Sequence, residues 1–372
     1  MSKRIHHLSP LALLALTACG GGGGGGSSSG SSSSGGSGSS GSSSYSILGK
    51  VIKGPLTNAL VFLDYNDNGT FDAGETSVRT ASDGSYTLTS SQASVSIVAL
   101  TDDTTIDSSS GSVLTGVTLR APSGASVVSP NTTLMKEAGL TAAEVGEVLG
   151  LSADIDITTF NPYATGVDAA KALAVEKVSQ QIMTTISTFA AVTEGSGASA
   201  ADSFSTALAS VVEVVQQKAV AFKSDPSVKL DLSSTTDLAS IKNSVTTKAA
   251  SVSGVDQTAL ATISNDTATA IKNVNAKIDT VTDLTSDDSK NVFSTTQVLS
   301  EQVETAAKTE AAGGSGSIEF VNTARIDSAA ANAAPTDISL SASTISENAG
   351  SLIIGSFSTT DDQKSGGFTY RL

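Results

Sequence analysis

The sequence predicts a multidomain α+β protein in which a small antiparallel β-sandwich is followed by an all-α helical bundle or stalk and then by part of a second β-sandwich. The spacing of apolar residues predicts this order. Short alternating runs fill 45–128, helical spacing fills 129–312, and alternation returns over 335–372 after a linker at 313–334. With 372 residues, the chain can hold two or three domains.

Short runs of alternating apolar and polar residues predict the strands of the first sandwich. These runs cover 47–52, 59–63, 85–88, 95–100 and 117–119. Turn residues separate them. Several short strands at this spacing are typical of an antiparallel sandwich.

From about Pro130 the apolar residues recur at three- and four-residue steps, which predicts helices. Thr141 and Glu144 have the spacing of a capping box at a helix start. Longer helices are predicted over Val175–Phe189, Phe204–Phe222, Leu238–Val252, Leu260–Val281 and Leu299–Val303. Breaks are expected near Gly195, Pro226, Gly254 and Asp283. Each helix carries one narrow apolar stripe, which favours an antiparallel bundle or a partly extended stalk.

The N-terminal segment predicts export. Lys3 and Arg4 precede the apolar run Leu11–Leu16, which is too short to span a bilayer. We therefore expect residues 1–18 to be a signal peptide.

The signal ends in Leu16–Cys19, which resembles the lipobox of bacterial lipoproteins. The resemblance implies cleavage before Cys19, acylation of Cys19 and attachment to a membrane. The residue after Cys19 is not Asp, which in Gram-negative lipoproteins implies the outer membrane or cell surface. An ordinary secretory signal with an incidental cysteine is the alternative.

Residues 20–44 are Gly and Ser without exception. Such a segment has no apolar side chains to bury and behaves as a flexible coil. Together with Cys19 it is predicted to be a tether that holds the first folded domain away from the lipid surface. A low-complexity tract without a role is the alternative.

Composition argues against nucleic-acid binding and against enzymatic activity. The formal net charge is −15, which repels nucleic acid and suits divalent cations. His6 and His7 lie in the predicted signal and Cys19 is the only cysteine, so Ser-His-Asp and Cys-His catalysis are excluded for the mature chain. The adjacent carboxylates Asp102-Asp103 and Asp287-Asp288 are expected in a loop and at a helix start.

Asp64–Glu75 fits the twelve-residue calcium loop D-x-[DN]-x-[DN]-G-x5-E at every specified position. The expected Ca²⁺ ligands are the side chains of Asp64, Asn66 and Asn68, the backbone carbonyl of Thr70, Asp72 directly or through water, and both carboxylate oxygens of Glu75. Gly69 occupies the position where the chain reverses sharply.

Two of the first three ligands are neutral Asn, so we expect weak affinity, on the order of 10⁻⁵–10⁻³ M. The alternative is an Asx-rich hairpin turn that binds nothing. The flanks of the loop are strand-like, so the loop is predicted on a β scaffold and not in a helix-loop-helix unit.

Gly49–Asp64, the loop and Thr80–Leu88 resemble the B-type β-sandwich repeats of bacterial surface adhesins. The resemblance implies a rigid, calcium-stabilised spacer. Ser129–Leu134 and Phe160–Tyr163 are similar to a segment that follows such domains in marine bacterial surface proteins, with no assigned chemistry.

The C-terminal segment 335–372 resembles the start of a bacterial cadherin-like repeat. The resemblance implies weak calcium ligation by Glu347 and Asp361, and Gln363 stands where the family has a second Asp. Because a complete sandwich of this kind needs about 100 residues, we expect this shorter segment to be poorly folded on its own.

These observations together predict a lipid-anchored, non-enzymatic cell-surface adhesion or scaffold protein with calcium-stabilised β-modules. Its expected partners are the membrane, through lipidated Cys19, and cell-surface proteins or glycans, but not nucleic acid. The alternative is an envelope lipoprotein that binds a soluble protein or glycan through its helical region.

Overall fold

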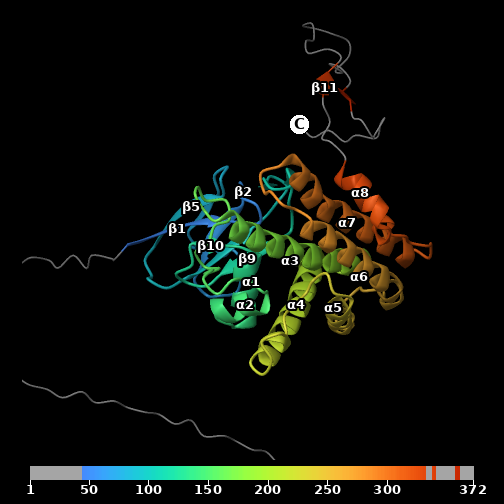
Figure 1. Cartoon of the computed structure of the whole chain (residues 1–372), viewed down its shortest axis with the longest axis horizontal. Helices are drawn as coiled ribbons and strands as arrows, with labels where there is room; N and C mark the ends of the chain where they lie inside the picture. The colour runs from blue at the N-terminus through green and yellow to red at the C-terminus, as the bar shows by residue number, and fades with distance from the viewer. Residues whose placement is uncertain (1–43, 332–336, 341–356, 361–372) are drawn as a thin grey trace, which may run out of the picture. The chain divides into compact units, whose positions relative to one another are not determined.

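The computed structural model describes residues 44–331 with their side chains and two further strands at 337–340 and 357–360. The described part is mixed α+β (Figure 1). The predicted signal peptide, Cys19 and nearly all of the tether lie outside the described residues. The proposed calcium ligands Glu347 and Asp361 also lie outside them.

The N-terminal part of the described chain, residues 45–128, forms ten short strands. They are β1 (Tyr45–Val51), β2 (Leu56–Thr57), β3 (Leu60–Asp64), β4 (Ser77–Arg79), β5 (Ser85–Ser90), β6 (Ser96–Leu100), β7 (Ile106–Asp107), β8 (Ser112–Val113), β9 (Thr118–Ala121) and β10 (Val127–Val128). All five predicted strands are present, as β1, β3, β5, β6 and β9. The other five are two or three residues long, too short to show a period.

The strands form three small sheets with the orders β10-β1-β5, β4-β3-β6-β9 and β2-β7-β8. All pairs among these strands are antiparallel except β1 with β10. β5 alternates buried and more exposed residues, as expected for a strand with one face in the core and one face toward solvent. β3 is buried over Val61–Asp64 because it lies in the middle of its sheet and is covered on both faces.

Residues 130–330 are helical. The helices are α1 (Pro130–Ala138), α2 (Ala142–Val148), α3 (Ala169–Gly195), α4 (Ala200–Phe222), α5 (Thr235–Ala249), α6 (Gln257–Asp279), α7 (Asp287–Ala311), η1 (Glu319–Val321) and α8 (Thr323–Ala330). The five predicted long helices are α3 to α7, and the breaks fall where they were expected. No helix within the described residues is long and apolar enough to cross a bilayer.

Local capping explains where these helices begin. The predicted capping box of Thr141 and Glu144 is present at α2, and Ser129 makes a second one at α1 with Thr132. Each of α3 to α7 begins after a Ser or Asp whose side chain accepts a bond from the first turn.

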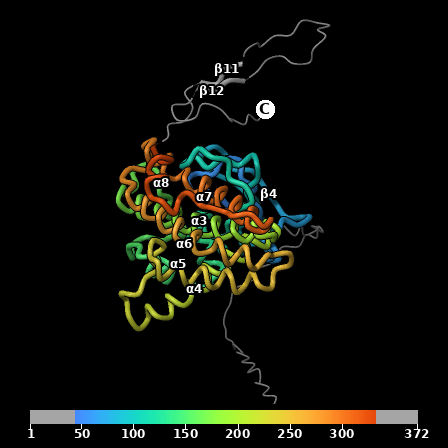
Figure 2. Tube along the Cα trace, turned by 90° about the vertical axis from the view of Figure 1, so that its right-hand side faces the viewer, coloured from blue at the N-terminus to red at the C-terminus, as the bar shows by residue number. Residues whose placement is uncertain are grey.

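The long helices lie in three layers. Both views show α7 and α8 on one side, α3 and α6 in the middle, and α4 and α5 on the other side (Figures 1 and 2). Accordingly, α3 packs against α4, α6 and α7, and α6 packs against α5 and α7.

The prediction of one narrow apolar stripe on every helix is wrong for α3. Because α3 is covered on several sides, it buries polar residues as well as apolar ones. Its buried polar residues are Glu176, Ser179, Gln180, Gln181, Thr184, Thr185, Thr188 and Thr193. Several threonines bond back to the carbonyl four residues earlier, which satisfies a hydroxyl without a partner on another helix.

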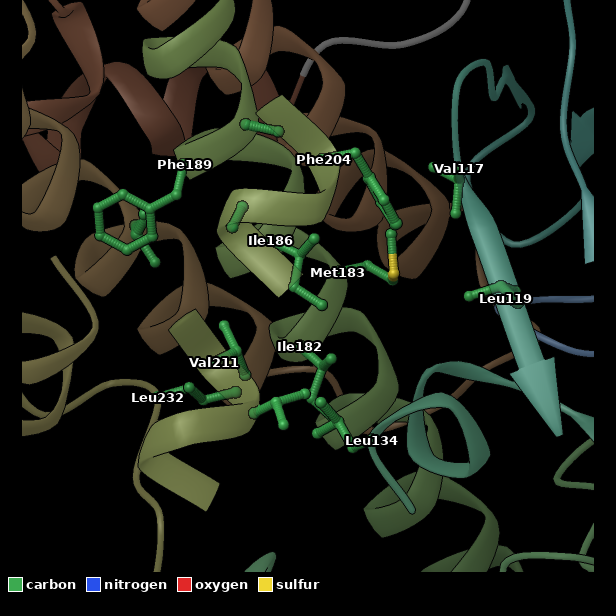
Figure 3. Close-up of a cluster of buried hydrophobic side chains, with 14 of the residues drawn as sticks. Val117, Leu119, Leu134, Ile182, Met183, Ile186, Phe189, Phe204, Val211 and Leu232 are labelled. Carbon is green, nitrogen blue, oxygen red and sulfur yellow. The ribbon is translucent and has the colours of Figure 1, made fainter. Parts of the chain in front are cut away.

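The sheets and the helices share one apolar core, so the expected boundary at 128/129 falls inside it. Figure 3 shows Val117 and Leu119 from the β9 region opposite Met183 on α3 and Phe204 on α4. Because strand and helix side chains fill the same core, neither half buries its apolar face alone.

Part of the expected linker is folded. Within 313–334, the chain forms η1 and α8, and Ile318, Phe320 and Ile326 are buried. The two strands at the end of the described chain, β11 (Asp337–Leu340) and β12 (Phe357–Thr360), pair antiparallel with each other.

Candidate functional site

The predicted calcium loop connects β3 to β4. Asp64 is the last residue of β3, and its side chain is fully buried. Phe71 packs against the buried ring of Phe62 with ring centroids 5.3 Å apart. The loop is therefore exposed at its tip but held at its base by a buried carboxylate and an aromatic contact.

Asp64 organises the first half of the loop. Its Oδ1 accepts a bond of 3.0 Å from Asn68 N, and its Oδ2 accepts one of 2.7 Å from Gly69 N. Gly69 has φ +75°, and Asp67 has φ +61°. The chain thus reverses at the predicted glycine, in the left-handed region where a side chain is costly.

The two asparagines turn toward one carboxylate. The Nδ2 atoms of Asn66 and Asn68 both donate to Asp72 Oδ2 at 2.8 Å. These bonds lower the pKa of Asp72, with Asn66 the larger cause. Three of the predicted ligands, Asn66, Asn68 and Asp72, therefore meet at one carboxylate oxygen.

Glu75 closes the loop at its far end. Its Oε1 accepts from Tyr65 N at 3.1 Å, and its Oε2 accepts from Asp72 N at 2.8 Å. Thr70, whose carbonyl is the predicted ligand, donates its N–H to Asn68 Oδ1 at 2.7 Å. The six predicted residues thus form one connected hydrogen-bond network.

Basic residues outside the motif tie the loop to the following strand and helix. Arg120 on β9 places Nη2 3.2 Å from Asp64 Oδ2 and 3.1 Å from Asp67 Oδ1, and places Nη1 2.8 Å from Glu137 on α1. Lys136 on α1 lies 2.7 Å from Asp67 Oδ2 and is the main cause of the lowered pKa of Asp67.

These four residues were missed by the sequence reasoning. Asp67 occupies a variable position of the motif, and Arg120, Lys136 and Glu137 lie more than fifty residues away. Only the pairing of β3 with β6 and of β6 with β9 places Arg120 beside the loop.

The donor set fits a hard divalent cation in type, because all predicted ligands are oxygen atoms of carboxylates, amides or the backbone. Asp64 Oδ2 accepts bonds from Gly69 and Arg120, whereas Oδ1 accepts one bond, from Asn68 N, and keeps a second lone pair for a cation. A half-turn of the Asn66 and Asn68 amides would exchange their NH₂ groups for carbonyl oxygens facing Asp72.

The alternative of a metal-free Asx turn is also consistent with this geometry. Asn68 N donates to Asn66 Oδ1 and Thr70 N to Asn68 Oδ1, as in successive Asx turns. Across the fully described residues 44–331, no three His, Cys, Asp or Glu side chains gather closely enough to hold a metal ion by themselves. Calcium binding stays a prediction that depends on the two amides and the Thr70 carbonyl.

The two adjacent carboxylate pairs predicted in a loop and at a helix start are found there, and each has a stabilising role. Asp102 and Asp103 lie in the turn after β6, where Asp102 pairs with Arg79 at 2.6 Å. Asp287 and Asp288 lie in the first turn of α7, where negative charge is favourable.

No family model matches the chain, and the searches of curated proteins and of solved structures also found no match.

Proposed function

We propose that this chain is a lipid-anchored, non-enzymatic cell-surface adhesion or scaffold protein whose β part is stabilised by Ca²⁺ in the loop 64–75. The observation that carries the proposal is the hydrogen-bond network of the loop, in which Asn66 and Asn68 meet at Asp72, Asp64 accepts from Asn68 N, and Glu75 closes the loop. The lipid anchor rests on the Cys19 motif in the sequence.

The charges of the loop support a role for a cation. Asp64, Asp72 and Glu75 place three carboxylates within twelve residues, and Arg120 pairs with the first of them. Asp72 is balanced only by the neutral amides of Asn66 and Asn68. A divalent ion would replace these amide bonds with direct charge neutralisation and would link the ends of β3 and β4.

Thermal unfolding in the presence of Ca²⁺ or chelator tests the calcium site. The unfolding temperature of the full chain should rise with Ca²⁺, and the rise should disappear in the Asp72→Asn and Glu75→Gln variants. Asp225→Asn is the matched control, because Asp225 forms an Asx turn with Ser227 outside the loop. An unfolding temperature of the wild type that is indifferent to chelator would remove calcium from the proposal.

The anchor needs its own experiment. When the chain is expressed in a bacterial host, the wild type should be found in the membrane fraction and should partition into detergent micelles. The Cys19→Ser variant should be found in the soluble fraction instead. Equal partitioning of the two proteins would contradict the lipid anchor without bearing on calcium.

A second candidate function is supported by a cavity of ≈ 640 Å³ between residues 112–117 and helices α3, α4 and α7. Val113, Leu114, Phe204 and Phe293 are apolar residues of its lining, and its volume is within the usual range for ligand sites. This favours a partner that binds through the helical region.

A variant that fills this cavity tests the second function. Gln297→Trp on α7 would obstruct the cavity, and Val298→Trp, on the same helix but outside the lining, is its control. Binding of a cell-surface protein or glycan should be lost in the first variant only.

A further inference from the structure

The cavity of ≈ 640 Å³ is a groove that follows helices α3 and α7. Thr184 Oγ1 and Thr296 Oγ1 lie 2.7 Å apart in a hydrogen bond between the two helices. Further along, a Cβ at Gly195 would lie 2.5 Å from the carbonyl oxygen of Glu304, so the helices run in the same direction. The α7 wall extends from Phe293 to Glu304, which is about 16 Å of helix at 1.5 Å per residue. The groove therefore has two separate ends.

Away from Glu304, the walls of the groove are largely apolar. Phe293 on α7 and Phe204 on α4 line it and are only 1% and 9% exposed. Val113, Leu114 and Val117 form the wall that the β part contributes. Figure 3 shows Val117 and Phe204 facing each other across this region. An apolar chain that lies here would be removed from water, which is favourable.

The Glu304 end of the groove is acidic. Glu194 on α3 and Glu301 and Glu304 on α7 line it. Glu304 pairs with Lys308, whereas the carboxylate of Glu194 has no side-chain hydrogen bond among the described residues. Burial raises the pKa of Glu194, and the charge of Glu304 raises it further. This end thus holds three carboxylates and one amine, and a cation would relieve their repulsion.

The other charges of the lining cancel. Lys53 and Asp107 line the groove as an ion pair of 2.6 Å, so they add no net charge. The lining therefore has four carboxylates and one amine, and its excess negative charge lies at the Glu304 end. Such a field favours a cationic ligand over a neutral or anionic one.

The spacing of the glutamates favours an organic cation over a metal ion. Across residues 44–331, no three carboxylates lie close enough together to hold a metal ion, and this includes Glu194, Glu301 and Glu304. An ammonium group accepts a more open set of oxygens, because its hydrogen bonds are longer than metal–oxygen bonds and need no closed shell of ligands.

We propose that this groove binds an aliphatic primary amine, with its ammonium group among Glu194, Glu301 and Glu304 and its chain along the apolar walls. The proposal rests on the second candidate function, because it uses the same cavity, and it names the chemical class of the ligand there.

The two parts of such a ligand match the two kinds of wall. The aliphatic chain buries apolar surface against Phe204, Phe293 and Leu114. The ammonium group has three N–H donors, and its hydrogen bonds to carboxylates are stronger than bonds between neutral groups. A ligand carboxylate in the same place would be repelled. The groove should therefore select an amine over an alcohol or an acid of the same length.

A titration followed by the NMR signals of the ligand tests this selection. The probes are hexylammonium chloride, hexan-1-ol and sodium hexanoate, which share one chain and differ in the head group. The protein is the full chain with Cys19→Ser, because a lipid anchor would require detergent and detergent takes up hexylammonium. Hexylammonium should bind about tenfold more tightly than hexan-1-ol, and hexanoate should bind more weakly still. Equal affinities for the three probes would overturn the proposal.

Variants locate the head group. Glu194→Gln and Glu301→Gln should each weaken hexylammonium binding and leave hexan-1-ol binding unchanged. Glu147→Gln is the matched control, because it removes the same charge from an exposed position on α2 outside the lining. An equal loss of hexylammonium binding in Glu147→Gln would show that only the overall charge of the protein matters and would overturn the site.

A second pair of measurements locates the chain. Leu114→Ser should weaken hexylammonium binding more than ethylammonium binding, because the shorter ligand does not reach the apolar wall. Circular dichroism should show each variant folded. An equal effect on the two amines would overturn the placement of the chain.

The amine site and the second candidate function can fail separately. If a protein or glycan partner is lost in Gln297→Trp but hexylammonium does not bind the parent chain, the amine proposal is overturned and the function stands. If hexylammonium binds and is lost in Gln297→Trp while protein and glycan partners are unaffected, the amine site is supported and that function is overturned.

Discussion

Arg120 holds the buried carboxylate of Asp64 from a strand 56 residues away, with Nη2 3.2 Å from Oδ2. Asp64 is fully buried in its side chain and Arg120 is 14% exposed, so this pair is shielded from water. We predict that Arg120→Gln destabilises the chain by about 3 kcal/mol in chelator, because it leaves a buried charge without its partner. Urea unfolding measures this change.

Calcium should recover part of that loss, because an ion in the loop would neutralise Asp64 in place of Arg120. The control is Arg79→Gln, which breaks the exposed pair with Asp102 and should cost less than about 1 kcal/mol. Equal losses in the two variants would contradict a special role for Arg120.

Gly84→Ala should be much more destabilising than Gly124→Ala. Both glycines have positive φ, +75° and +85°, so alanine costs about 1–2 kcal/mol at either position. A Cβ at Gly84 would also lie 2.6 Å from the carbonyl oxygen of Val51, whereas one at Gly124 would meet nothing within 4 Å. Thermal unfolding of the two variants should differ, and equal unfolding temperatures would refute this close approach.

Phe189→Ala on α3 should cost about 3–5 kcal/mol, since it leaves a cavity where a ring is fully buried between helices. Val220→Ala on α4 is the comparison, because Val220 is 71% exposed. It should change the free energy of unfolding by no more than about 0.5 kcal/mol. Chemical denaturation distinguishes the two, and a small loss for Phe189→Ala would show that α3 is not at the centre of the core.

Glu176→Gln should become more stable relative to the wild type as pH rises from 4.5 to 7. The folded pKa of Glu176 is raised to about 7 from the ordinary value of 4.5. Below 4.5 both states are neutral; above it the unfolded chain loses its proton first, which favours unfolding of the wild type. The gain should reach roughly 3 kcal/mol above pH 7, because one pKa unit is worth about 1.4 kcal/mol.

The groups that face Glu176 are Gly54 N, Gln180, Tyr163, Asp107 and Lys53. Glu144→Gln is the control, because the pKa of Glu144 is shifted in the opposite direction. Capping bonds from Thr141, followed by Lys223, lower the pKa of Glu144 to about 2, so its stabilisation is complete above 4.5 and is lost as pH falls through 2. Unfolding midpoints across pH 2–8 separate the two, and a flat difference for Glu176→Gln would contradict its buried, raised pKa.

Local chemistry made much of the fold predictable. The stripe from Val175 to Phe189 and the capping box at Thr141 depend on residues within one or two turns, so a single sequence shows them. The short strands β2, β7, β8 and β10 could not be predicted, because their two residues pair only when distant segments meet.

The candidate site also has a part that the sequence predicted and a part that it did not. The spacing within Asp64–Glu75 is local, and it placed six oxygen-bearing residues in one network. That Arg120 stabilises Asp64 depends on the order of strands in a sheet, which no local pattern encodes.

By itself, the sequence determined the positions of the long helices, the main strands and the reversal at Gly69, because caps, periodicity and glycine act over a few residues. The tertiary structure alone decided that α3 is buried on several sides and that Lys53 meets Asp107 beside Glu176. From the sequence alone, a charged residue on a helix is expected to face solvent. When neighbouring layers bury it instead, its charge needs hydrogen-bond or ion-pair partners, and only the packing of the layers determines which residues these are.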